Sequence, residues 1–582
     1  MNGQESTKPH QGGVNMVGHR KDLQPQTLEE EVRWALDFDP QDPDLGLNWE
    51  DLSSWRITRR TMLRLFIATG AFHYLSYLFN PPPLFAQGRP GGELRAAWNL
   101  REFTNLDPAF INQVFQFQVA SNVLSGLTHI DKDLIPRGDL AESWEVSRNG
   151  LQWTFHLRRG VRFHNGDPFT ADDVIYTYNR TLDPKVGSLH RAVLEGVERA
   201  EKLDDYTVRF TLSRPRASFL IKVTERSSGR ALTIVNRRAI EQMGKEYTRR
   251  PVGTGPFRIV EHRLGERLVL EKFPDYFVKG RPRLDRVVIF NIEEPATLVS
   301  ALEAGQVQFI NAIPEALYTR VKGNRDLIVS ETSDPGFQAI FFNLRADKKE
   351  RIGKEKLPTD DNRVRLAVAK AMDRDDLIKR ALLGRGIPAY GPVPPAQAAY
   401  FADLSKTSPQ RFNPEEARKL LAEAGFGGGF TVKMVVTPPT RRRGEVIADI
   451  LKRHANITVE LEVVDFPVQV QRFDSGQFEW LQIGSGGDYD PDDSIDDWFA
   501  SNSKFNTFGY ANPRVDALNA AQKTTTNPER RVKWVREIVE ILSRDAPCVF
   551  LFHGMDSVAY RKNVRGFIHI PSLRDLDTVT VG

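Results

Sequence analysis

Residues 140–180 carry the pattern that most constrains how this chain can fold. Every second residue of the segment 151–157 is large and apolar, which is the period of a strand buried on one face. The pair Asn149-Gly150 comes directly before this segment and is typical of tight turns between antiparallel strands. We therefore predict a β-hairpin here.

The same stretch continues into a predicted helix. Asn165-Gly166 begins a second turn, and Thr170 with Asp173 three residues later resembles a capping box. This string of hairpin, turn and capped helix resembles a signature of the family 5 extracellular solute-binding proteins of ABC importers. The resemblance implies a capture protein for peptides, nickel chelates or related solutes, with no catalytic step.

A second match to the family lies at residues 362–374, where Val364 and Val368 share one face of a predicted helix. Asp373 is placed to cap the helix that follows. The resemblance covers about residues 93–575. It implies an α/β fold of the two-lobed periplasmic-binding-protein type, with mixed sheets, a cleft between the lobes and an extra domain inserted in the first lobe.

The resemblance also implies a hinge of two chain crossings between the lobes. We expect the crossings near Phe341 and near Phe550, and we expect the strands at residues 549–552 and 557–560 to return to the first lobe. The expected parts of the chain are a disordered leader (1–55), a twin-arginine-type signal segment (56–90), the first lobe in three pieces (91–128, 251–340 and 549–582), an inserted domain (129–250) and the second lobe (341–548).

The start of the chain resembles an export signal. Arg59 and Arg60 resemble the twin-arginine export motif, and an apolar stretch follows at residues 65–79. That stretch of about 15 residues is short for a membrane span, which needs about 20. We therefore expect an exported, periplasmic protein, with a buried amphipathic helix or an uncleaved anchor as the alternative. No cysteine lies near the expected cleavage site at Ala86, which argues against a lipoprotein.

Composition excludes several classes of function. A formal net charge of +4 over 582 residues, without a basic stripe interleaved with aromatic residues, gives no sign of nucleic-acid binding. The single cysteine, Cys548, rules out an intrachain disulfide and a cysteine-based zinc site, and its apolar neighbours predict a buried side chain. We expect neither a metal nor another cofactor.

The segment 484–491 resembles the strand end and loop at which peptide-binding members of the family hold their ligand. The resemblance implies that Asp488, beside Tyr489, receives the α-ammonium group of the solute. A carboxylate suits this role, because lobe closure removes water and an unpaired ammonium would be costly there. The neighbouring glycines leave backbone groups free to pair with an extended ligand. The predicted contacts in this segment are Ser485, Gly486, Gly487, Asp488 and Tyr489.

Two features leave the role of this segment and the identity of its ligand undecided. The same aspartate-rich run could turn the chain and cap the next helix, which is the interpretation we favour for Asp492, Asp493 and Asp496. Gly484 and Ser485 stand where peptide-binding members commonly carry a bulky Trp. The size and the side-chain specificity of the ligand therefore stay undetermined.

A second group of predicted contacts lies on the first lobe. The loop after residues 105–108 matches the family segment that lines the cleft, and an ordinary surface loop with a helix start is an equal alternative. The residues concerned are Asn112, Gln113, Val114 and Phe115.

Other functions fit the sequence less well. An exported hydrolase would need a catalytic motif, and neither a Gly-x-Ser-x-Gly elbow nor a His-Glu-x-x-His pair occurs. The same fold could bind a metal chelate, an opine or an oligosaccharide, because a fold does not fix its ligand. A sensor or chaperone role is a further alternative. The expected partners are a peptide or small amine-bearing solute and an ABC permease and ATPase, with the chain acting as a monomer.

Overall fold

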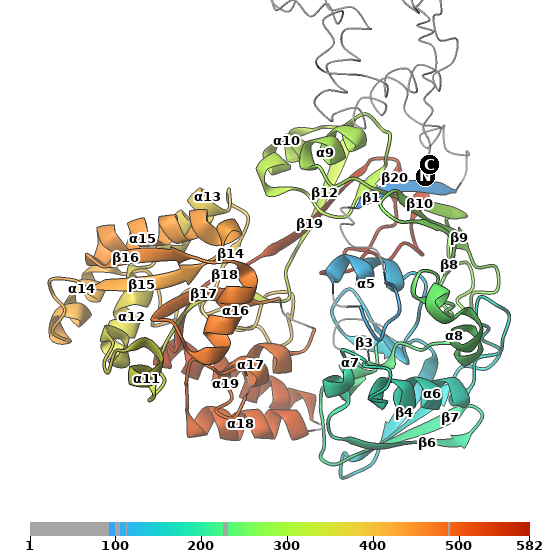
Figure 1. The fold of residues 1–582 in the computed structure, drawn as a ribbon, viewed down its shortest axis with the longest axis horizontal. Coiled ribbons are helices and arrows are strands. Elements are labelled where there is room, and N and C mark those ends of the chain that lie inside the picture. The colour runs from blue at the N-terminus through green and yellow to red at the C-terminus, as the bar shows by residue number, and fades with distance from the viewer. Residues whose placement is uncertain are drawn as a thin grey trace, which may run out of the picture. The chain divides into compact units, whose positions relative to one another are not determined.

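The computed structural model describes residues 92–98, 105–111, 113–224, 231–486, 489–503, 505–525 and 527–582 (Figure 1). The predicted leader and signal segments, with Arg59 and Arg60, lie outside the described residues. Asn112, Gly487 and Asp488 lie outside them as well. Within the described ranges, no helix is both long enough and apolar enough to span a bilayer.

A seven-stranded sheet, which we call the first-lobe sheet, forms one core. Its strands, in spatial order, are β12 (Leu327–Ser333), β19 (Met555–Arg561), β11 (Phe309–Ile310), β1 (Glu93–Trp98), β10 (Arg286–Asn291), β9 (Arg267–Lys272) and β8 (Phe257–Arg263). β1 pairs in parallel with β10 and β11. Leu94, Ala96 and Trp98 alternate along β1 and enter the same core as Val287 and Ile289 of β10.

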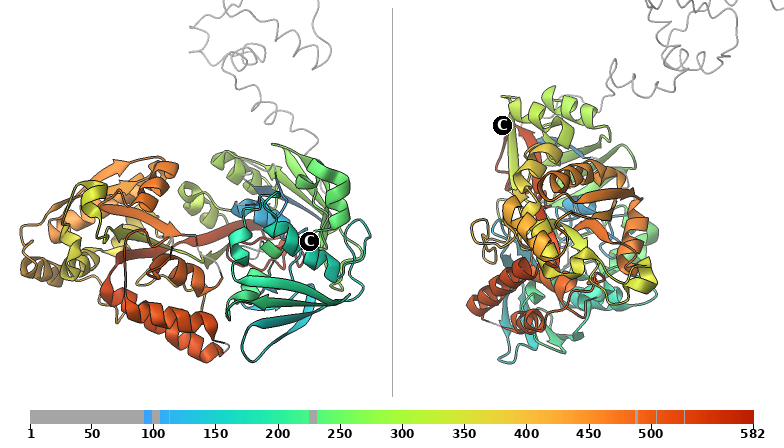
Figure 2. Two further views of the ribbon diagram at one scale, coloured as in Figure 1. Left: turned by 60° about the horizontal axis from the view of Figure 1, so that its bottom comes forward. Right: turned by 90° about the vertical axis from the view of Figure 1, so that its left-hand side faces the viewer.

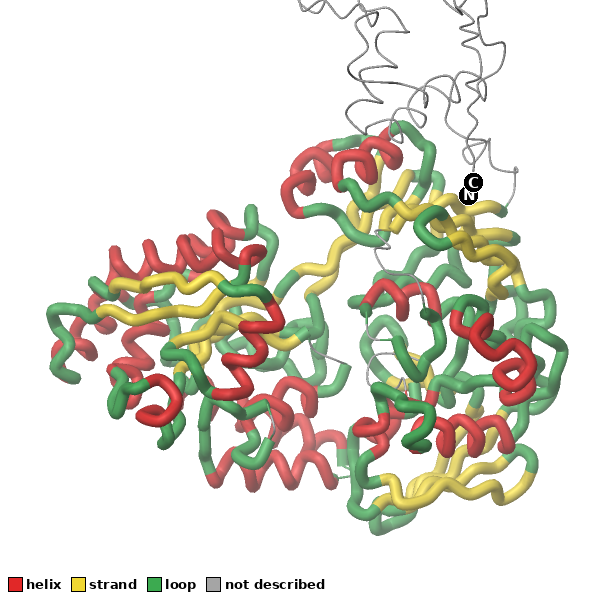
Figure 3. Tube along the Cα trace, viewed as in Figure 1, coloured by secondary structure: helices red, strands yellow, loops and turns green. Residues whose placement is uncertain are grey.

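A six-stranded sheet, the second-lobe sheet, is covered by helices on both faces (Figure 3). Its strands, in spatial order, are β14 (Ile387–Pro388), β18 (Cys548–His553), β13 (Phe337–Phe342), β17 (Trp480–Ser485), β15 (Thr431–Val436) and β16 (Thr458–Val463). Ile340 and Phe342 of β13 enter one core, and Phe341 enters the other. The helices are α12 (Asn362–Ala371), α13 (Arg374–Ala381), α14 (Pro414–Glu423) and α15 (Arg441–Ala455) on one face, and α16 (Phe466–Ser475), α17 (Pro491–Phe499), α18 (Pro513–Thr524) and α19 (Pro528–Asp545) on the other.

Several local predictions for the second lobe are confirmed. Val364 and Val368 of α12 are fully buried. Asp373 caps α13, since its side chain accepts a hydrogen bond of 2.9 Å from the backbone N–H of Asp376. Cys548 is buried, and burial raises the pKa of its thiol well above the ordinary value, which makes it a poor nucleophile.

A four-stranded sheet contains the predicted hairpin, which the structure confirms. Its strands, in spatial order, are β4 (Ala141–Val146), β5 (Gln152–Leu157), β7 (Thr207–Leu212) and β6 (Val197–Asp204). Gly150 has a φ of 70°, as a tight turn requires, and Trp153 and Phe155 are buried. The predicted helix is α6 (Ala171–Leu182), where the Thr170 N–H donates to Asp173 Oδ2 over 3.0 Å. Figure 2 shows this sheet with its helices packed on one face.

Two short segments carry the chain between the first-lobe and second-lobe sheets. Residues 334–336 connect β12 to β13, and Gly554 alone separates β18 from β19. The crossings contact each other, because the Asp334 N–H donates to the Gly554 carbonyl over 2.9 Å. A Cβ at Gly554 would lie 2.3 Å from Asp334 Oδ2, so any side chain here would displace that carboxylate.

These crossings differ from the predicted ones near Phe341 and Phe550. β13 and β18 pair with each other inside the second-lobe sheet, so the strand at residues 549–552 does not return to the first lobe, whereas β19 does. Side chains of β18 enter the cores on both faces of the second-lobe sheet, and an apolar run of this kind does not say which sheet it joins. We propose lobe boundaries at residues 334–336 and 554.

Asp334, in the first crossing, makes the stability of the folded chain depend on pH. Burial, aided by the nearby Asp556 carboxylate, raises the pKa of Asp334 to about 7, whereas an Asp in an unfolded chain titrates near ~3.9. The folded chain therefore binds this proton more tightly than the unfolded chain. The contribution of Asp334 to stability is greatest below the unfolded pKa and is lost as the pH rises through the folded pKa.

Asp334→Asn should raise the midpoint of thermal unfolding, and should raise it more at pH 8 than at pH 5, because the amide keeps the shape and removes the buried charge. The measurement is thermal unfolding of both proteins at the two pH values. Asp474→Asn, at an exposed position of α16, is the control. Equal midpoint shifts at pH 5 and pH 8 would contradict the assignment.

Candidate ligand-binding site

A cavity of about 1200 Å³ lies between the part of the chain that carries the four-stranded sheet and the second lobe. One wall comes from segments within residues 190–222, and the other from the end of β17 together with α17 and α18. Small-molecule sites typically measure roughly 300–1,000 Å³. The cavity therefore has room for a solute of several residues.

The end of β17 reaches this cavity because of the strand directions in the second-lobe sheet. β15 pairs in parallel with β16 and with β17, so all three strands end at one edge. Open α/β sheets bind their ligands at the carboxyl ends of parallel strands. β17 ends at Ser485, and Ser485 and Gly486 line the cavity. The structure thus places these two predicted contacts in the cavity wall.

The packing of β17 accounts for Gly484, one of the two residues at which the family resemblance implied a bulky Trp in peptide-binding members. A Cβ at Gly484 would lie 2.0 Å from the backbone carbonyl oxygen of Phe337 in the neighbouring strand β13. A larger residue would fit only if the two strands moved apart. The packing of the two strands therefore by itself favours glycine at this position.

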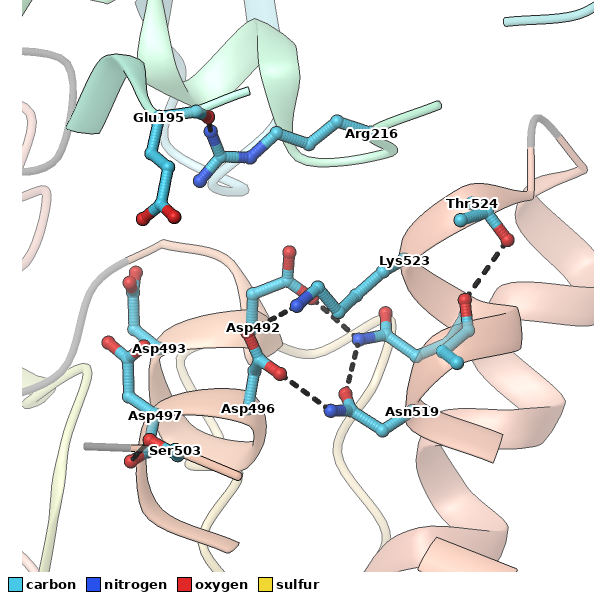
Figure 4. A network of polar contacts seen from close by, with 12 residues as sticks. Glu195, Arg216, Asp492, Asp493, Asp496, Asp497, Ser503, Asn519, Lys523 and Thr524 are labelled. Atoms are coloured by element: carbon cyan, nitrogen blue, oxygen red, sulfur yellow. Dashed lines mark hydrogen bonds and ion pairs between the residues drawn. The ribbon is translucent and has the colours of Figure 1, made fainter. Parts of the chain in front are cut away.

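Helix α17 supplies an acidic wall, and side chains of α18 hold it in place (Figure 4). Asn519 Nδ2 donates to Asp496 Oδ1 over 2.7 Å, and Lys523 Nζ pairs with the same carboxylate. Gln522 Nε2 donates to Asp492 Oδ1 over 2.6 Å. These bonds fix the orientations of the two carboxylates, so the acidic wall is preorganised.

The charged side chains around the cavity leave it negative. Although burial opposes ionisation, the Arg531 guanidinium lowers the pKa of Asp492 to about 2, so Asp492 is charged at neutral pH. An excess of carboxylates favours a solute with a positive group, and the cationic side chains can still receive a carboxylate. The carboxylates are Glu195, Asp492, Asp493, Asp496, Asp497 and Asp516, and the cations are Arg214, Arg216, Lys222 and Lys523.

Two contacts join the opposite walls of the cavity. Lys222 Nζ, which follows the four-stranded sheet in the chain, lies 3.5 Å from Asp493 Oδ1 of α17. The Ala217 N–H donates to the Lys523 carbonyl over 2.7 Å. Glu195 lies on the same side as Lys222, and Figure 4 shows it across from the acidic wall. A solute here would therefore meet residues of both walls.

Tyr489 lies in a different environment from the predicted ligand contact. Its side chain is buried with Ile221 and Leu573, and its hydroxyl donates to the Pro571 carbonyl over 2.7 Å. The hydroxyl is therefore bonded to the C-terminal segment and does not face the cavity. Tyr489 ties the segment that follows β17 to residues outside the second lobe.

The predicted first-lobe contacts are placed apart from the cavity lining. Gln113 precedes α5 (Val114–Ala120), and its N–H donates to Gln116 Oε1 over 3.0 Å. Val114 is exposed, and Phe115 packs at the edge of the first-lobe core. Of the described residues that line the cavity, none is one of these three. Their contact with a solute stays a prediction.

Sequence reasoning missed Arg531, which lies buried beneath α17. Its guanidinium pairs with both Asp490 and Asp492. Arg531 is 41 residues from Asp490 in the chain, so no local pattern links the two. The aspartate-rich run itself was the available signal, because closely spaced buried carboxylates need cations.

The family of the chain follows from comparison with known proteins. Residues 136–507 match the model of the bacterial extracellular solute-binding proteins, family 5 Middle. That match spans more than half of the chain and includes both the hairpin and the end of β17. The chain belongs to family 5 of the bacterial extracellular solute-binding proteins.

Relatives of this family 5 member match it over most of their length. The glutathione-binding protein GsiB of Pectobacterium atrosepticum is 29% identical over 490 residues, which cover 81% of this chain and 90% of GsiB. HbpA2 of Haemophilus parasuis shares 25% identity with a TM-score of 0.75, covering 84% of this chain and 100% of HbpA2. DppA of Helicobacter pylori, an ABC transporter-associated periplasmic binding protein solved with the peptide STSA, shares 25% identity with a TM-score of 0.66, covering 84% and 98%.

These matches confirm the two-lobed α/β fold and the general function. The chain is the substrate-binding component of an ABC importer, and its family consists of binding proteins rather than enzymes.

The contact between Tyr489 and Pro571 can be tested without a ligand. Tyr489→Phe removes the buried hydroxyl and leaves the Pro571 carbonyl without this donor, which should lower the free energy of unfolding by about 1 kcal/mol. Urea unfolding of the two proteins measures the difference. A variant as stable as the parent would mean that the hydroxyl does not make this bond in solution.

Proposed function

We propose that the chain captures a peptide or another small solute that bears an ammonium group. The observation that carries the proposal is the acidic wall of α17 beside Ser485 and Gly486 at the carboxyl end of β17. GsiB is named as a glutathione-binding protein, and the DppA structure contains a peptide, which supports a peptide-like solute for this chain. Asp488 is the residue we assign to the ammonium group.

The proposed mechanism has no chemical step. The solute binds between the walls of the cavity, the lobes close about residues 334–336 and Gly554, and the closed form docks on a membrane permease. Ligand-driven closure requires that the solute bind the closed form more tightly than the open form. We further propose that the chain is monomeric, catalyses no reaction, and works in the periplasm after twin-arginine export without a lipid anchor.

A solute with an acidic group is a second candidate. Arg214, Arg216 and Lys222 line the wall opposite α17, where they could receive a carboxylate or another anion. A zwitterionic solute would use both walls, with its ammonium group near α17 and its anionic group near these cations. Opines and metal chelates that carry carboxylates belong to this class.

A thermal-shift screen tests the proposed function. The panel contains reduced glutathione, di- and tripeptides, the same peptides with an acetylated N-terminus, amines without a carboxylate, and opines. A solute at a concentration a hundredfold above its Kd should stabilise the folded chain by about 2.7 kcal/mol. Stabilisation by amine-bearing solutes supports the proposal, and stabilisation only by solutes without an amine contradicts it.

Asp488→Ala should remove most of the stabilisation that an amine-bearing solute produces, because the ammonium group then loses the carboxylate that we pair with it in the closed site. The unfolding midpoint is measured with and without the solute. Asp474→Ala, on the exposed side of α16, is the matched control and should keep the full shift. An undiminished shift in Asp488→Ala would overturn the assignment of Asp488.

A further inference from the structure

Arg531 of α19 is buried and has every N–H donor paired. Its Nε donates to Gln522 Oε1 over 3.0 Å, and Nη1 donates to the Tyr400 hydroxyl over 3.0 Å. Two further bonds, Nη1 to Oδ2 over 2.8 Å and Nη2 to Oδ1 over 2.6 Å, hold Asp490 in the bidentate manner. Nη2 also donates to Asp492 Oδ1 over 3.2 Å. Five donors thus meet acceptors from four side chains, which leaves the guanidinium a single orientation.

The two carboxylates lie where the chain enters α17. Asp490 is the N-cap residue, and its Oδ1 accepts a hydrogen bond of 3.0 Å from the Asp492 N–H. Asp492 belongs to the first turn of the helix and also lines the cavity. Arg531 is not a cavity-lining residue, so it lies directly behind the wall. The guanidinium therefore fixes the N-terminal end of α17, where the acidic wall begins.

The guanidinium is the cation of this cluster. It pairs with both Asp490 and Asp492, and all three side chains are buried. Although burial opposes its charge, the two carboxylates raise the pKa of Arg531 well above the ordinary value, so the guanidinium stays charged. A charged, buried guanidinium with paired donors holds its acceptors in place, directly behind the wall at which we place an ammonium group.

We propose that Arg531 is a positioning residue for solute binding. Through Asp490 and Asp492 it fixes the start of α17, and it does not touch the solute. The inference rests on the proposed function, because the solute must bind beside this end of the helix. The alternative is that Arg531 only holds α19 against α17 and affects overall stability.

Arg531→Lys separates these two roles, because lysine keeps the positive charge but lacks the planar guanidinium that pairs with a carboxylate through two hydrogen bonds. In the solute-free chain, amide hydrogen exchange should become roughly fivefold faster in the segment 484–492 and stay unchanged in the rest of the second lobe. Affinity for the probe solute, reduced glutathione or trialanine, should fall about tenfold by calorimetry. Arg514→Lys is the matched control, since Arg514 pairs with Glu537 at the surface.

A milder variant covers the case in which Arg531→Lys does not fold. Tyr400→Phe removes one acceptor of the guanidinium and leaves both carboxylates in place, so the same exchange change should appear in the segment 484–492 with a smaller loss of affinity, roughly threefold.

Unchanged exchange in the segment 484–492 would overturn the positioning role, and so would faster exchange spread over the whole second lobe. Unchanged affinity of Arg531→Lys for a probe that the parent chain binds would overturn it as well. If the parent chain binds neither probe, the proposed function fails for those solutes, while the exchange measurement still decides whether Arg531 orders the start of α17.

Discussion

The hydrogen bond between Asp334 and Gly554 joins the only two places at which the described chain passes between the first-lobe and second-lobe sheets. On one side of it β12 pairs with β19, and on the other β13 pairs with β18, antiparallel in both cases. An antiparallel pair of strands therefore continues from the first-lobe sheet into the second-lobe sheet, and both strands change sheet at the same point. Any closing motion has to turn about residues 334–336 and 554, which is the hinge type of domain closure.

The position of the candidate site follows from this pair of strands. β13 begins directly after the hinge and pairs with β17, whose last residue, Ser485, lies opposite Phe337. The end of β17 is therefore held next to the hinge, and Arg531 pairs with Asp490 where α17 begins. Tyr489 binds the segment between β17 and α17 to the Pro571 carbonyl. A solute at the end of β17 would thus bind close to the two crossings between the sheets.

Local patterns in the sequence were sufficient for the hairpin at Asn149-Gly150 and the helix start at Thr170, because both depend on neighbouring residues. They were insufficient for β18, because its apolar run would fit a strand of either sheet. The chain changes sheet at the single residue Gly554, which follows β18. Local patterns were also insufficient for the site. Ser485 and Gly486 were found through the family resemblance, whereas the guanidinium of Arg531 and the acceptor for Tyr489 lie far away in the chain.

A structure of the chain with its bound solute tests the central claim most directly. The account predicts a solute between the two walls of the cavity, with its ammonium nitrogen about 2.7–3.2 Å from a carboxylate oxygen of Asp488, and with the lobes turned about residues 334–336 and 554 relative to the solute-free chain. A solute bound away from the end of β17, or bound there without any turn at the two crossings, would contradict it.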